Sequence, residues 1–387
     1  MSLSAAVVAE PTVTDQTCGL TTPIRFATFN VFLNRPEQGE LQRDLGNSDT
    51  QARKVAEIIA HIRPDVLLLN EFDFDPSGNT LSLFADEYLA KVAKPFRPIQ
   101  YPYRYLAPSN TGIAAPIDVN GDGVIKGPSD AYGYGSFPGQ YAMALLSRYP
   151  IESHQVRTFQ NFLWRDMPRA EIPQNFYTDQ ELEIFRLSSK SHWDIPIRVD
   201  ELLIHALAAH PTPAVFDGVE DHNGRRNHDE IRLWADYIDG AGYLYDDRGR
   251  TGGLARNERF VIVGDYNADP VDGDSRNNAI NQLLNHALVD ASQPPNSAGA
   301  VVAAKLDKLD RPHKGDPATD TSDFSQNLRI DYVLPSHWGL DIEQTGVFWP
   351  TPDDPLYDLV GDGDPIQSSD HRLVWADLRP TQCTKDD

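Results

Sequence analysis

The sequence is poor in cysteine, in positive charge and in long apolar runs. Two cysteines among 387 residues exclude a small domain held together by several disulfides. No apolar run reaches the roughly 18 residues that a membrane-spanning helix needs. Lys and Arg number 34 against 57 Asp and Glu, which gives a formal net charge of −23. Because nucleic acids are polyanions, broad electrostatic binding of DNA or RNA is disfavoured.

The two cysteines, Cys18 and Cys383, stand near the two ends of the chain. The termini of one domain often lie close together, so a disulfide between them would close nearly the whole chain and indicate an oxidising compartment. Two unrelated thiols are the equally weighted alternative. The first ten residues lack a basic segment and resemble an added start before the small-residue tail of a removed signal peptide. We therefore expect a secreted or periplasmic protein.

The remaining composition is that of a globular protein. Hydrophobic residues make up 40% of the chain, which is enough for a large buried core. Internal repeats, low-complexity tracts and long linkers are not found in the sequence. We expect a flexible segment over residues 1–20, a single domain over residues 21–380 and a tail over residues 381–387.

Short apolar runs predict buried strands at residues 24–29, 66–69, 142–146, 202–208, 260–263, 330–334 and 373–376. Amphipathic spacing predicts helices that begin after Ser48 and Asp49, at Asn227 and after Ser275. Turn-rich stretches at about 72–140, 150–200, 290–327 and 345–368 are typical of functional loops or insertions. Strands interleaved with helices favour an α/β or α+β sandwich of two sheets flanked by helices.

Polar side chains stand at the ends of most of these predicted strands. They are Asn30, Glu71, His210, Asp265 with Asn267, Asp331, and Asp370 with His371. Carboxylates and carboxamides are the ligands that Mg²⁺ and Mn²⁺ prefer, and these ions bridge to phosphate oxygens. The pattern predicts a metal held by Glu71, an attacking water positioned or deprotonated by Asp265, and a histidine that stabilises the developing charge.

The same segments occur in a characteristic order. They run from Phe26-Ala-Thr-Phe-Asn30 through residues 65–71, 144–151, 209–210, 264–267 and 329–332 to Ser369-Asp-His371. Each motif is weak alone, but the ordered set covers almost the whole chain. In this the sequence resembles the endonuclease/exonuclease/phosphatase family, which includes DNase I-like nucleases, inositol-phosphate phosphatases and neutral sphingomyelinases. The resemblance implies a DNase I-like four-layer α/β/β/α sandwich, here with long loop insertions.

The resemblance also implies roles for the residues at the strand ends. Glu71 would be the principal metal ligand, Asn30 would shape the metal site, and Asp370 would lie beside the metal or a second metal. His210 would contact the scissile phosphate, while Asp265 and Asn267 would orient the phosphate and the attacking water. Asp331 would hydrogen bond to His371 and fix its tautomer. Hydrolysis would depend on Mg²⁺ or Mn²⁺ and proceed by in-line attack of water.

Two adjacent arginines, Arg225 and Arg226, follow His210 in the sequence and are candidates for substrate binding. A guanidinium makes bidentate bonds to oxyanions, and a helix N-terminus adds positive potential. The equally weighted alternative is a solvated polar turn paired with Glu220 and Asp221.

The segment from residue 118 to 130 resembles the first half of a calcium-binding loop. Oxygen donors alternate and glycines allow a sharp turn, but Ser129 stands where the last acidic ligand is usual and prolines interrupt both flanks. We expect one structural Ca²⁺, with a metal-free turn as the alternative. Its ligands would be Asp118, Asn120, Asp122, Val124 and Asp130.

Together these features favour a secreted, metal-dependent phosphatase or phosphodiesterase acting on a small or exposed phosphoester. A secreted endonuclease or exonuclease is the first alternative, and the net charge of −23 disfavours it. A catalytically inactive, calcium-stabilised binding module is the second. No protein partner is evident from the sequence.

Overall fold

Two β-sheets pack face to face in the computed structural model, which describes residues 22–306, 313–324, 326–362 and 365–381. The first sheet has the order β10 (Leu340–Val347), β11 (Val374–Pro380), β1 (Ile24–Leu33), β2 (Val66–Phe72), β4 (Met143–Ser147), β3 (Tyr103–Tyr105). The second has the order β5 (Arg157–Thr158), β6 (His192–Val199), β7 (Leu202–Ala209), β8 (Arg259–Asp265), β9 (Asp331–Pro335).

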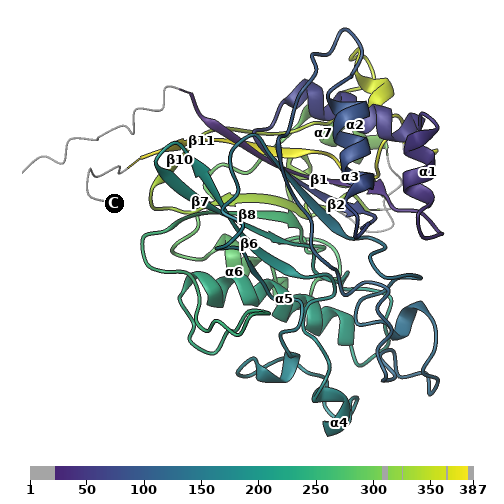
Figure 1. Cartoon of the computed structure of the whole chain (residues 1–387), viewed down its shortest axis with the longest axis vertical. Helices are drawn as coiled ribbons and strands as arrows, with labels where there is room; N and C mark the ends of the chain where they lie inside the picture. Colours follow the sequence, from purple (N-terminus) through teal and green to yellow (C-terminus); the bar gives the residue numbers. More distant parts are fainter. Residues whose placement is uncertain (1–21, 307–312, 325, 363–364, 382–387) are drawn as a thin grey trace, which may run out of the picture.

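Helices cover the outer faces of the two sheets (Figure 1). On the side of the first sheet lie α1 (Glu40–Gly46), α2 (Thr50–Ile62) and α3 (Asn79–Leu83). On the side of the second lie α5 (His222–Ile238) and α6 (Asn281–Leu284), with α4 (Asp179–Leu182) further out. A further helix, α7 (Ala298–Leu306), follows the second sheet's helices in the chain. The layers therefore have the order helix, sheet, sheet, helix.

Strand alternation separates the core into three parts, because successive side chains point to opposite faces of a sheet. In β1, Phe26 packs between the sheets, whereas Ala27 packs under the helices of the first sheet. In β8, Val261 packs between the sheets and Ile262 packs toward α5. All four side chains are almost fully buried, so each sheet is covered on both faces.

The strand directions bring several strand ends to one edge of the sandwich. β1 and β2 are parallel neighbours, as are β7 and β8, while β9 and β11 run antiparallel to β8 and β1. The C-terminal ends of four strands therefore meet the N-terminal ends of two others. Close approach of β7 and β8 requires Gly264, since a Cβ atom there would lie 2.0 Å from the carbonyl oxygen of Ala209.

The predicted sandwich and its seven predicted strands are confirmed. The helix after Asp49 is also confirmed, and the Asp49 side chain accepts a hydrogen bond from the Ala52 amide at its N-terminus. Two predictions were wrong in detail. The stretch 150–200, which was predicted to be a functional loop or insertion, contains β6. Pro196 hides this strand in the sequence, because proline is uncommon inside a sheet. In the structure the Pro196 carbonyl accepts a hydrogen bond from the Glu152 amide. Helix α5 begins at His222, so Asn227 lies inside it.

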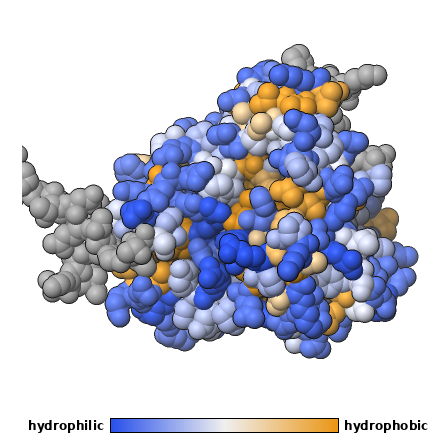
Figure 2. All heavy atoms as spheres, turned by 90° about the horizontal axis from the view of Figure 1, so that it is seen from above, coloured by the Kyte–Doolittle hydropathy of each residue, from blue (hydrophilic) through white to orange (hydrophobic). Residues whose placement is uncertain are grey.

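The helix predicted after Ser275 is short: a 3₁₀ turn precedes α6, which ends at Leu284. Cys18 and Cys383 lie outside the described residues, so their pairing and the limits of the domain stay predictions. Within the described part of the chain, no helix is long and apolar enough to cross a membrane. Hydrophilic side chains predominate on the face that Figure 2 shows, with apolar patches between them.

Candidate active site

The strand-end side chains converge on the carboxylate of Asp265, the last residue of β8. Its Oδ2 accepts a hydrogen bond of 3.0 Å from Nδ2 of Asn30, which β1 carries in the other sheet. The Nε2 atoms of His210 and His371 lie 3.4 and 3.8 Å from the same oxygen. Asp265 Oδ1 accepts the amide of Asn267 at 3.0 Å. Both sheets thus contribute to one buried polar group.

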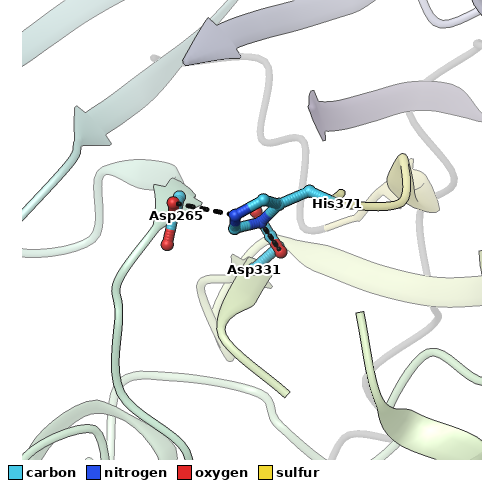
Figure 3. Close-up of side chains that lie close together, drawn as sticks. All are labelled: Asp265, Asp331 and His371. Atoms are coloured by element: carbon cyan, nitrogen blue, oxygen red, sulfur yellow. Dashed lines mark hydrogen bonds and ion pairs between the residues drawn. The ribbon is translucent and has the colours of Figure 1, made fainter. Parts of the chain in front are cut away.

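His371 and Asp331 form a tightly held pair next to Asp265 (Figure 3). Nδ1 of His371 lies 2.9 Å from Oδ2 of Asp331, and Thr321 donates its hydroxyl to the same oxygen at 2.7 Å. Burial lowers the pKa of His371, but the carboxylates of Asp331 and Asp265 outweigh burial and raise it well above its ordinary value. His371 is therefore an imidazolium at neutral pH, oriented by Asp331.

His210, in contrast to His371, is neutral. Burial, together with the positive charges of Lys190 and His371, lowers the pKa of His210 well below its ordinary value. Its Nδ1 is buried and has no hydrogen-bond partner among the described residues. A neutral His210 can donate a hydrogen bond from one ring nitrogen but adds no positive charge.

Glu71 lies in β2 with a backbone φ of 56°, a region that few non-glycine residues adopt. Its Oε2 accepts a hydrogen bond of 2.8 Å from Nδ2 of Asn34. Burial raises the pKa of Glu71 to about 7, and the charge of Asp370 also raises it, against the lowering effect of His371. Burial likewise raises the pKa of Asp265 to about 6. Two crowded acids therefore hold protons more tightly than usual.

This crowding fits a divalent cation, because a cation would neutralise buried carboxylates that otherwise repel one another. Among the described residues, ligand atoms of Asp265, Asp331 and His371 lie within 4.8 Å of one another. An imidazolium cannot coordinate a metal, however, since both ring nitrogens carry protons. The oxygen donors Glu71, Asp265 and Asn30 are better suited to Mg²⁺ or Mn²⁺.

Lys190 is a site residue that the sequence reasoning missed. It lies two residues before β6 and is buried. Burial lowers the pKa of its ammonium, against the raising effects of Glu230, Glu71 and Asp265. The insertion before β4 holds this segment, because the amide of Asn110 donates to the Lys190 carbonyl at 2.8 Å. Recognising residues 192–199 as a strand would have placed Lys190 at the edge of a sheet with the other candidates.

The structure corrects the expectation for the two arginines. Arg226 is buried, and its guanidinium donates to the backbone carbonyls of Leu187, Tyr132 and Arg186. Its donors therefore hold loops together and are not free for a phosphate. Arg225 donates to the carbonyl of Glu220 at 2.9 Å.

Arg225 also makes an ion pair of 3.6 Å with Glu171, in a cluster that includes Asp221 and Arg276. These contacts match the self-pairing that the alternative proposed, although the arginines lie in the first turns of α5 and not in a solvated turn.

The calcium ligands predicted in the 118–130 segment are used in local turns. Asp118 accepts the amides of Gly121 and Gly123 at 2.7 Å, and Asp122 accepts the amide of Val124 at 2.8 Å. Asn120 accepts the Asp122 amide at 3.1 Å, and buried Asp130 accepts the amides of Val119 and Lys126. Among the His, Cys, Asp and Glu side chains of the described residues, the group of three close ligand atoms is at the active site and does not include Asp118, Asp122 or Asp130. The calcium ion is without structural support and stays a prediction.

Two mixed sheets flanked by helices define a DNase I-like α+β protein. A model of the Endonuclease/Exonuclease/phosphatase family matches residues 27–371. The chain therefore belongs to this family, whose members are generally metal-dependent phosphoester hydrolases. A comparison with curated proteins found no match.

A comparison with solved structures found similar chains at low sequence identity. An endonuclease/exonuclease/phosphatase from Beutenbergia cavernae is 16% identical, with a TM-score of 0.50 over 93% of this chain and 72% of that chain. Sphingomyelinase C from Streptomyces griseocarneus is 15% identical, with a TM-score of 0.45 over 92% and 99%. A beta toxin mutant with bound magnesium ions from Staphylococcus aureus is 14% identical, with a TM-score of 0.46 over 92% and 99%. At 16% identity, the similarity to the Beutenbergia cavernae structure concerns the fold alone.

Proposed function

We propose that this protein is a divalent-metal-dependent hydrolase of phosphoester bonds. The observation that carries the proposal is the convergence of Asn30, His210 and His371 on the buried carboxylate of Asp265. A single acid surrounded by one amide and two imidazoles from both sheets is a costly arrangement for a purely structural role, since buried charges are stabilising only when paired. It is well suited to activating water beside a phosphate.

The charge state of each side chain determines its proposed role in hydrolysis. Asp265, with a pKa of about 6, is largely ionised at neutral pH and can accept a proton from the attacking water. Asn267 holds the Asp265 carboxylate through its amide. The His371 imidazolium, oriented by Asp331, stabilises charge that develops on the phosphoryl oxygens. Lys190 adds a second positive charge on the β6 side of the site.

The metal would be held by Glu71 with Asp265 and Asn30, and Asp370 would lie nearby. Bound Mg²⁺ or Mn²⁺ supplies a positive charge that polarises the phosphoryl group. This ligand set uses oxygen donors, which agrees with the choice of a hard divalent ion.

A small phosphoester is the favoured substrate over duplex nucleic acid. The net charge of −23 repels a polyanion, and Arg225 and Arg226 are committed to protein carbonyls and carboxylates. We therefore infer phosphatase or phosphodiesterase activity, with secreted nuclease activity as the alternative. Rapid plasmid cleavage at 150 mM salt would favour the nuclease.

Hydrolysis of bis-p-nitrophenyl phosphate tests the proposal directly. Wild-type protein should hydrolyse it with Mg²⁺ or Mn²⁺ and lose the activity in EDTA, and Glu71→Ala should be inactive under both conditions. An equal, metal-independent background in both proteins would instead favour an inactive binding module.

A further inference from the structure

Two buried side chains on one face of α5 bond to three segments that carry the candidate active site. We infer that Asn227 and Glu230 are positioning residues, which set the distance between the segments around Lys190, His210 and Asp265. The inference rests on the proposed function, because it concerns the geometry of the same site. Neither residue is within hydrogen-bond distance of the converging group at Asp265.

Glu230 joins the Lys190 segment to the His210 segment through its two carboxylate oxygens. Oε1 accepts the amide of Ser189 at 2.6 Å and its hydroxyl at 3.0 Å. Oε2 accepts the amide of Thr212 at 2.7 Å. Ser189 is the residue before Lys190, and Thr212 lies two residues after His210. Because Glu230 is fully buried, no water competes for these bonds.

Asn227 joins the His210 segment to the end of β8. Its Nδ2 donates to the carbonyl of Thr212 at 2.8 Å and to the carbonyl of Tyr266 at 2.9 Å. Tyr266 lies between Asp265 and Asn267, and Asn267 in turn donates to the Pro211 carbonyl at 3.1 Å. Asn227 and Glu230 are three residues apart, so they share one face of the helix.

The two residues therefore connect three chain segments that are far apart in the sequence. Lys190 comes before β6, His210 after β7, and Asp265 at the end of β8. The sheet hydrogen bonds fix the strands, but Lys190 and His210 lie just outside them. Bonds from a rigid helix fix these flanking residues, and a displacement of about 1 Å in such a site can reduce a rate about 100-fold.

A neighbouring carboxylate on α5 provides a matched control. Asp229 is as buried as Glu230 and accepts hydrogen bonds from Trp164 Nε1 at 2.7 Å and from the Glu171 amide at 2.6 Å. Those partners belong to the segment 164–171, which carries none of the candidate site residues. Asp229→Asn and Glu230→Gln both replace a buried, hydrogen-bonded acid by its amide, so both should lower the melting temperature.

The kinetic test compares these two variants of the full chain on bis-p-nitrophenyl phosphate with Mg²⁺, at a temperature where both are folded by circular dichroism. Glu230→Gln should lower kcat by about 10–100-fold, whereas Asp229→Asn should leave kcat close to that of wild type. A purely structural role predicts equal kcat for the two variants, and that result would overturn the inference. If Glu230→Gln does not fold, Asn227→Ala makes the same comparison.

Hydrogen exchange provides a test that does not depend on activity. Glu230→Gln should speed exchange in peptides over residues 186–192 and 209–214, and Asp229→Asn should speed it over residues 163–172. Unchanged protection in the first two peptides would overturn the positioning role. An inactive wild-type protein with this exchange pattern would instead overturn the proposed function and leave the structural connection standing.

Discussion

Magnesium binding should be strongly coupled to pH through the two crowded acids of the site. Both carboxyl groups must be deprotonated to hold a cation. With a pKa of about 7 for Glu71 and about 6 for Asp265, the fraction of protein with both groups ionised is about 0.9 at pH 8 and about 0.05 at pH 6. We therefore expect Mg²⁺ to bind about 20-fold more weakly at pH 6 than at pH 8.

Isothermal titration calorimetry in buffers of different ionisation enthalpy measures both the affinity and the protons released. The same pKa values predict release of about one proton per Mg²⁺ at pH 6.5. In Glu71→Gln only Asp265 titrates, so the change in affinity between pH 8 and pH 6 should fall to about twofold. Asp73→Asn is the control. Asp73 also has a pKa raised to about 7, but its carboxylate accepts the amides of Arg35 and Tyr141, so this variant should keep the wild-type change in Mg²⁺ affinity.

The raised pKa of Glu71 also predicts how the stability of the protein depends on pH and on Mg²⁺. A carboxyl group whose pKa is raised in the folded state destabilises the metal-free protein as pH rises from its unfolded value of about 4.5 toward 7. Mg²⁺ should therefore raise the melting temperature more at pH 7.5 than at pH 5.5. An affinity that is constant from pH 6 to pH 8, or a pH dependence that Glu71→Gln leaves unchanged, would refute this account of the metal site.

Three further substitutions test separate parts of the structure. Asp331→Asn removes the carboxylate that keeps His371 protonated, so kcat should fall by about 10²–10⁴-fold. The alkaline limb of the pH–rate profile should also move to lower pH, and an unmoved limb would contradict this role. Lys190→Met should lower kcat/KM about 100-fold with an unchanged far-UV circular dichroism spectrum, and an unaltered kcat/KM would place Lys190 outside the site. Gly264→Ala should destabilise the protein by about 1–3 kcal/mol in urea unfolding, because its methyl group would collide with β7; wild-type stability would contradict that close approach.

The positions of the catalytic candidates could be predicted from the sequence because their signal is local. Asn30, Glu71 and Asp265 each follow an apolar run within two residues, and this pattern marks a buried strand and its polar end. The order of these runs, together with the helices between them, indicates layered sheets. Where the local signal was interrupted, as by Pro196 in β6, the strand and the adjacent Lys190 were both missed.

The partners and charge states of these residues depended on the tertiary structure. Asn30 and Asp265 are 235 residues apart, and their hydrogen bond exists because two sheets pack face to face. His210 and His371 look alike in the sequence, yet one is held neutral by burial and nearby positive charges while two carboxylates keep the other protonated. Arg226 likewise looked like a phosphate ligand until its carbonyl partners were known.

The sequence by itself thus determined which chemical groups stand at the strand ends, since hydrophobic periodicity and residue type are properties of a short stretch of chain. The tertiary structure decided which of them meet, which carry a proton and which are used in packing. Hydrogen bonding and desolvation act through space over a few ångströms, and only the folded chain brings residues such as Glu230, Ser189 and Thr212 within that range.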